Sequence, residues 1–152
     1  MSCDTWGKEY GEDEAWYDVS GPAIFAGDDD RLRLALASVL VRLPKRVRHF
    51  VQRRCQILSI GGLGVWGITW PASIVDKRKV KWLIVMSETA YRSQGRRESA
   101  IAHEVAHAWL GHNRLDPDIS PDVEEEADNQ AVAWGFSRSY SPAQLAVLTR
   151  RP

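Results

Sequence analysis

Two histidines and a glutamate within five residues have types and spacing that point to metal chemistry. Residues 103–107 read HEVAH, so His103 and His107 are four positions apart. In an α-helix such positions lie one above the other, and both imidazoles can therefore reach one metal ion at about 2.0–2.1 Å. Glu104 is rotated by about 100° from His103, which suits its carboxylate to activating a water molecule beside the ion rather than to binding the ion.

The surrounding residues predict the helix that this geometry needs. After residues 93–95 the apolar residues recur with a helical period, and Gly111 supplies a C-terminal cap. The predicted helix is apolar nearly all round, so we expect it to be buried. If both histidines were ordinary core residues at an accidental spacing, several polar groups would be buried unpaired, at about 1–3 kcal/mol each. A bound metal removes that cost, and the pattern therefore favours a metal site.

A catalytic zinc ion needs a third protein ligand and an open fourth position. The three-histidine pattern HExxHxxGxxH is excluded, because Leu110 and Asn113 stand where it requires glycine and histidine. His112 lies about 140° around the helix from His107, so we expect it to cap the helix end instead of binding metal.

A second helix downstream carries the candidates for the third ligand. We expect it to run from about Pro121 to Trp134, and residues 124–128 within it read EEEAD. If it folds back against the HEVAH helix, Glu124 can reach the metal and Asp128 can accept a hydrogen bond from the second nitrogen of a ligand histidine. Glu125 and Glu126 lie between these two residues, and solvated negative charge near a helix N-terminus is a sufficient role for both. The alternatives for the third ligand are Glu125, Glu126 and Asp128.

The two segments HEVAHAWLGH and EEEADNQAVAWGF resemble the gluzincin metallopeptidases. They are particularly similar to phage-immunity-regulator peptidases (ImmA/IrrE type), membrane heat-shock peptidases (HtpX type) and minimal single-domain gluzincins. The resemblance covers about residues 80–136. It implies one Zn²⁺ per chain, held by His103, His107 and Glu124, and hydrolysis of a protein or peptide substrate with Glu104 as general base.

Such enzymes usually have a further donor that stabilises the oxyanion. The sequence offers three candidates that flank the two helices: Tyr91, Arg138 and Tyr140. In the runner-up interpretation the chain is a zinc-stabilised binding or regulatory module without turnover. Retention of Glu104 argues against that alternative, because a structural metal site has no use for a general base.

The elements that position these residues follow from patterning in a chain of 152 residues, enough for one domain. Acids at 28–30 open a predicted helix, and a second is expected from Pro44 to about Arg54. Three β-rich runs follow, CQILSI, VWGITW and VKWLIVM, and the second is expected at a sheet edge because of Gly67 and Pro71. We expect a zincin-like α+β domain over residues 23–152, with N-terminal helices and a small, mostly antiparallel sheet of three to four strands.

Residues 1–22 mix acids with aromatics without a clear period, which predicts an irregular arm docked on the domain. An alternative is an inhibitory segment whose Cys3 thiolate reaches the metal. A last short helix is expected from about residue 141.

Charge and hydropathy exclude several partners. Twenty basic residues balance twenty acidic ones, so we expect no nucleic acid or membrane partner, and the basic cluster within residues 45–54 is interpreted as a solvated helix face. The N-terminus lacks a secretion signal and no apolar run approaches the roughly twenty residues of a membrane span. These features predict a cytoplasmic protein, with Cys3 and Cys55 as reduced thiols, and leave its oligomeric state open.

Overall fold

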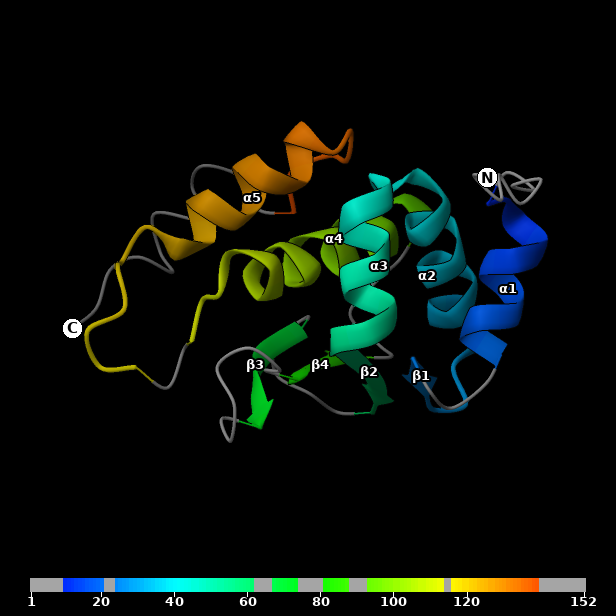
Figure 1. Cartoon of the computed structure of the whole chain (residues 1–152), viewed down its shortest axis with the longest axis horizontal. Helices are drawn as coiled ribbons and strands as arrows, with labels where there is room; N and C mark the ends of the chain where they lie inside the picture. Colours follow the sequence, from blue (N-terminus) through cyan, green and yellow to red (C-terminus); the bar gives the residue numbers. More distant parts are fainter. Residues whose placement is uncertain are drawn as a thin grey trace, which may run out of the picture.

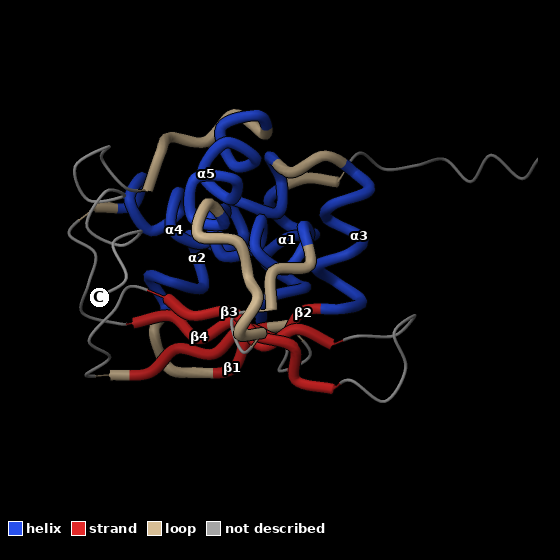
Figure 2. Tube along the Cα trace, turned by 90° about the vertical axis from the view of Figure 1, so that its left-hand side faces the viewer, coloured by secondary structure: helices blue, strands red, loops and turns tan. Residues whose placement is uncertain are grey.

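The helices and strands form two layers. The computed structural model of the chain describes residues 10–20, 24–61, 67–73, 81–87, 93–113 and 116–139. Within these ranges five helices lie on one side of a four-stranded sheet, as Figure 2 shows. Buried side chains from both layers, among them Leu36, Ile84 and Val105, share one hydrophobic core. The α+β composition predicted from the sequence is therefore confirmed.

The sheet is mixed, and the expectation of a mostly antiparallel sheet is wrong. Its order is β1-β2-β4-β3; β2 pairs in parallel with β1 and β4, and β3 pairs antiparallel with β4. The strands are β1 (Phe25–Ala26), β2 (Cys55–Ile60), β3 (Gly67–Ser73) and β4 (Lys81–Ser87). The apolar β4 takes an inner place because its consecutive residues Ile84, Val85 and Met86 are all buried. A simple meander would pair β3 with β2, but here β4 lies between them.

Strand β3 lies at the edge of this sheet, as predicted for VWGITW. Pro71 has no backbone N–H and is best accommodated where one side of a strand is unpaired. Over residues 67–70 of β3 buried and half-buried positions alternate, and Gly67 and Thr69 are the buried ones. The buried side of the edge strand faces α4 (Gln94–Leu110).

Three helices precede the site: α1 (Glu12–Ser20), α2 (Asp30–Arg42) and α3 (Lys45–Arg54). The Asp29 carboxylate caps α2 by accepting from two backbone amides, and α3 begins directly after Pro44, both close to prediction. Helix α1 corrects the expectation of an irregular arm over residues 1–22. Its buried residues, Ala15 and Val19, are fully covered and join the common core. Two buried positions in nine residues are too few for a clear helical period, and residues 1–9 and 21–23 lie outside the described ranges.

The active-site candidates lie on two neighbouring helices, α4 and α5 (Val123–Ala133), which run side by side in Figure 1. Helix α4 ends at Gly111, whose φ of +75° fits the predicted glycine cap. Helix α5 starts two residues later than predicted, and Ala127 and Ala131 on it are fully buried. These small side chains allow the two helices to approach closely. No helix in the described part of the chain is long and apolar enough to span a bilayer.

Helix α2 holds the end of α5 in place through Arg42. The guanidinium donates to the Gly135 carbonyl at 2.7 Å and to Glu98 of α4 at 3.0 Å, and it lies 4.1 Å from the centroid of the Phe136 ring. One side chain thus connects three helices. The helix predicted from residue 141 lies outside the described residues.

Candidate metal centre

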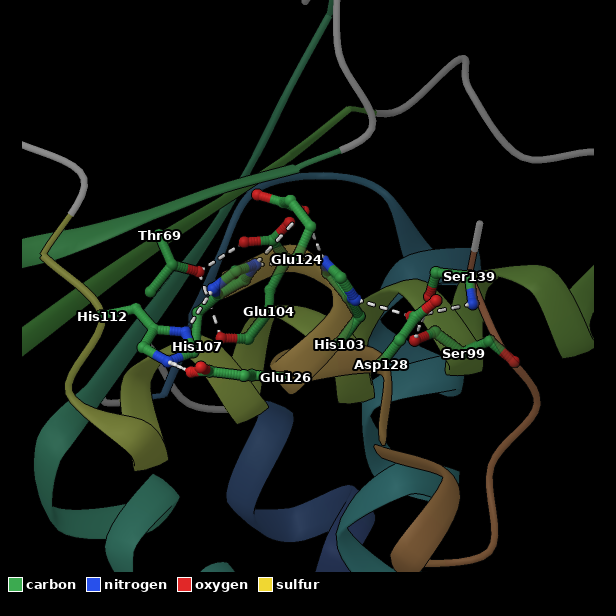
Figure 3. A network of polar contacts seen from close by, with 10 residues as sticks. All are labelled: Thr69, Ser99, His103, Glu104, His107, His112, Glu124, Glu126, Asp128 and Ser139. Carbon is green, nitrogen blue, oxygen red and sulfur yellow. Dashed lines mark hydrogen bonds and ion pairs between the residues drawn. The ribbon is translucent and has the colours of Figure 1, made fainter. Parts of the chain in front are cut away.

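Three polar side chains converge between α4 and α5. The Nε2 atom of His103 lies 3.1 Å from Nε2 of His107 and 3.1 Å from Oε2 of Glu124. The third side of this triangle, from His107 Nε2 to Glu124 Oε2, measures 3.5 Å. Figure 3 shows the two imidazoles and the carboxylate meeting at one point. The structure therefore brings together the three ligands predicted from the sequence.

The triangle has the size that a zinc ion requires. Bonds of 2.0–2.1 Å in tetrahedral geometry separate neighbouring ligand atoms by about 3.3 Å. The observed separations of 3.1, 3.1 and 3.5 Å bracket this value. Both histidines are at most 1% exposed, whereas the Glu124 side chain is 15% exposed. The residues present fit a metal ion approached from the Glu124 side.

The outer nitrogen of His103 is held by a buried carboxylate. Asp128 Oδ1 lies 2.8 Å from His103 Nδ1 and also accepts the backbone N–H of Ser139 at 3.1 Å. Because an ionised carboxylate only accepts, the Nδ1 atom of His103 carries a proton. The hydrogen bond expected between Asp128 and a ligand histidine is present, and it turns the Nε2 atom of His103 toward His107 and Glu124.

Charge around His103 changes its titration. Burial lowers the pKa of this imidazole, but hydrogen bonds with Asp128 and Glu124 and the nearby charge of Glu104 outweigh burial and raise the pKa to about 9. Without a metal, a proton on His103 is therefore favoured at neutral pH. A metal ion bound at Nε2 must displace that proton.

We expect zinc binding at pH 7.5 to release about one proton per chain, because His103 must become neutral to bind the ion. Calorimetric titrations in buffers of different ionisation enthalpy measure this number, and apparent affinity should rise with pH until about 9. In chelator-treated protein, protonation of His103 stabilises the fold. This contribution to the free energy of unfolding is complete below about pH 6.5, the pKa of histidine in the unfolded chain, and is lost as the pH rises to about 9. A binding enthalpy that does not depend on the buffer at pH 7.5 would contradict the raised pKa.

The general-base candidate Glu104 is buried against the edge strand. It is 2% exposed, and its Oε2 lies 2.6 Å from Oγ1 of the fully buried Thr69. The same hydroxyl lies 3.1 Å from the main-chain carbonyl of Glu104. Thr69 was not among the residues predicted from the sequence. The sequence feature that could have indicated Thr69 is the alternation of sides along the predicted edge strand, which places Thr69 on the same side as Gly67.

Gly67 allows β3 to approach Glu104. A Cβ atom at this position would lie 2.8 Å from Cγ of Glu104 and 3.0 Å from Sδ of Met86. Contacts this short force a neighbour to move, and both neighbours are buried. Glycine is therefore required here by the close approach of backbone and side chain.

The substitution Gly67→Ala should displace the Glu104 side chain or the edge strand and destabilise the fold by about 1–3 kcal/mol. Zinc affinity should stay unchanged, because none of the three ligand side chains is touched. Denaturant unfolding and a zinc titration measure the two effects. Gly95→Ala is the matched control, since its Cβ meets nothing within 4 Å on an exposed turn of α4. Equal stability of the two variants would show that the Gly67 contact is not tight.

His112 has a role that its position in the sequence did not predict. Its backbone N–H donates to the His107 carbonyl at 2.9 Å, so it does help to close the helix end as expected. Its imidazole, however, lies between two partners: Nδ1 is 3.0 Å from Nδ1 of His107, and Nε2 is 2.9 Å from Oε2 of Glu126 (Figure 3). Glu126 is exposed, as expected for solvated charge, but its carboxylate also contacts His112, which was not predicted.

Of the remaining candidates, the structure describes Glu125 and Arg138. Glu125 is exposed, and the exposed Arg138 donates to Asn129 Oδ1 at 2.6 Å. The other two oxyanion candidates, Tyr91 and Tyr140, lie outside the described residues, as does Cys3. Cys55 carries a free thiol, and burial raises its pKa to about 12.

Comparisons of the chain with protein-family models, curated proteins and solved structures found no match. The gluzincin resemblance therefore stays a prediction from the two sequence motifs.

Proposed function

We propose that this chain is a zinc-dependent peptidase of the gluzincin type, with Glu104 as the general base. The observation that carries the proposal is the triangle of His103 Nε2, His107 Nε2 and Glu124 Oε2, with sides of 3.1–3.5 Å. A second carboxylate, that of Glu104, is buried on α4, the helix that carries both histidines. Two imidazoles and one carboxylate with solvent access at one side make a set typical of catalytic rather than structural zinc.

The ligand residues and the base have separate tasks. His103, His107 and Glu124 would hold the ion, which when bound supplies a Lewis acid that acidifies water and polarises a carbonyl group. Glu104 takes the proton of the attacking water and passes it to the leaving amine. Thr69 donates to Oε2 of Glu104, which restrains the carboxylate and leaves Oε1 to act as the base.

The edge strand supports a peptide as the substrate. Thr69 of β3 contacts Glu104, so the sheet edge runs directly beside the base. The outer side of an edge strand offers backbone N–H and C=O groups that an extended peptide can pair with. A peptide bound in this way would pass the site in an extended form, with its scissile bond near Glu104. Protein or peptide substrates are the class that this arrangement favours.

Metal dependence of cleavage tests the proposal. Protein purified without chelator should hold about one zinc ion per chain by elemental analysis, and it should cleave members of a peptide library. Removal of the metal should abolish cleavage, and added zinc should restore it. Bound zinc without cleavage would instead favour the binding or regulatory module, and absence of metal binding would overturn the assignment of the site.

A further inference from the structure

We infer that His112 and Glu126 are positioning residues for the metal site: together they select the tautomer of His107 whose Nε2 lone pair points at the metal. The inference rests on the proposed function and deepens it, because it assigns two residues outside the ligand set to metal affinity. Neither residue touches the metal position. Both act through the ring of His107.

The proton positions follow from the order of the contacts. Glu126 Oε2 lies 2.9 Å from Nε2 of His112, and because a carboxylate accepts, this nitrogen of His112 carries a proton. A neutral imidazole protonated at Nε2 has its lone pair at Nδ1. His112 Nδ1 lies 3.0 Å from Nδ1 of His107 and accepts a hydrogen bond from the N–H group there. The Nε2 atom of His107 is then left with a lone pair, and this atom faces His103 and Glu124.

The opposite tautomer of His107 cannot bind a metal through Nε2, because that nitrogen would carry a proton. A protein that populates both tautomers loses affinity in proportion to the unsuitable fraction. The inner hydrogen bond is protected from water, since His107 is fully buried and the His112 side chain is 10% exposed. The outer end of the chain of contacts reaches the surface, because the Glu126 side chain is 52% exposed.

The two ligand histidines are thus oriented by different devices. His103 is held directly by the buried carboxylate of Asp128, at 2.8 Å. His107 is held by a carboxylate acting through a second imidazole. The turn at Gly111 makes this possible, because its left-handed backbone, with φ of +75°, ends the helix and brings His112 back beside His107.

Zinc affinity measured by competition with a chelator tests the inference. His112→Phe keeps a ring and removes both nitrogens, and it should weaken zinc binding by about 10- to 100-fold. Glu126→Gln should weaken it by less, since an amide oxygen can still accept from His112. The control Glu125→Gln removes the adjacent, exposed carboxylate of the same helix and should leave affinity unchanged. Unchanged affinity in both His112→Phe and Glu126→Gln would overturn the inference.

Nitrogen NMR of the imidazoles provides a readout that a merely structural role would not move. In the wild type we expect the proton of His112 on Nε2 and a nitrogen–nitrogen coupling across the hydrogen bond to His107 Nδ1. Glu126→Gln should lower the population of this His112 tautomer, because an amide group can donate to Nε2 as well as accept from it, while Glu125→Gln should not change it. A wild-type proton on His112 Nδ1 would overturn the inference even if His112→Phe fails to fold. If the wild type binds no zinc, the proposed function fails, and the tautomers remain measurable in the same spectra.

Discussion

Replacing Glu124 by alanine is expected to lower zinc affinity by more than about 100-fold, the upper end of the loss seen when a residue behind a ligand is removed. Glu124 supplies the carboxylate of the proposed set, 3.1 Å from one ligand nitrogen and 3.5 Å from the other. Its loss leaves two neutral imidazoles, which neither complete the coordination nor balance the charge of a divalent ion. Metal competition assays and elemental analysis of the purified variant measure the effect.

Glu125→Ala is the control for this substitution. Glu125 is adjacent in sequence and equally charged, but it is exposed on α5, so its loss should change zinc affinity by less than about twofold. The two variants differ only in which face of the helix loses its carboxylate. Equal losses of zinc would show that Glu124 is the wrong carboxylate.

The second large effect is expected for Glu104→Gln, which should reduce peptide cleavage by about 10²- to 10⁴-fold. Glutamine has nearly the same shape and can still pair with the hydroxyl of Thr69, but it cannot take a proton from water at neutral pH. Zinc content should stay at the wild-type level, because Glu104 is not among the three converging ligand side chains. Initial rates with a peptide that the wild type cleaves, together with elemental analysis, measure both quantities.

Glu98→Gln is a suitable control for this variant, because Glu98 lies on the same helix and pairs with Arg42 at 3.0 Å, as part of the contacts that connect α2, α4 and α5. It should keep both zinc and cleavage. Cleavage retained in Glu104→Gln would remove Glu104 from the mechanism. Zinc lost from Glu104→Gln would place its carboxylate among the ligands.

The helix substitutions together separate the enzyme from the non-catalytic module. Glu124→Ala tests whether the converging side chains bind metal, and Glu104→Gln tests whether bound metal is used for hydrolysis. If Glu124→Ala loses zinc but the wild-type protein already shows no cleavage, the protein would be a zinc-stabilised module. The buried Glu104, held at 2.6 Å from Thr69 beside a sheet edge, is the feature that favours the enzyme.

Local chemistry in the chain was enough to predict the part of the site that lies on α4. Helical periodicity and a glycine cap predicted the helix, and the spacing of His103, Glu104 and His107 then determined which side chains share a face. The edge position of β3 was also predictable, since Gly67 and Pro71 suit an edge strand. These features depend on residues that are close together in the sequence, so they can be predicted without knowing how distant segments pack.

Contacts between distant residues could be established only from the folded chain. Thr69 and Glu104 are 35 positions apart, and the distance between His112 and Glu126 depends on how α5 packs on α4. The parallel pairing of β2 with β4 likewise reflects which strand is most deeply buried, a competition between all the strands. Helix α1 gains its order from packing Ala15 and Val19 into the common core. Periodicity describes one element at a time, whereas these arrangements arise because several elements bury their apolar faces together.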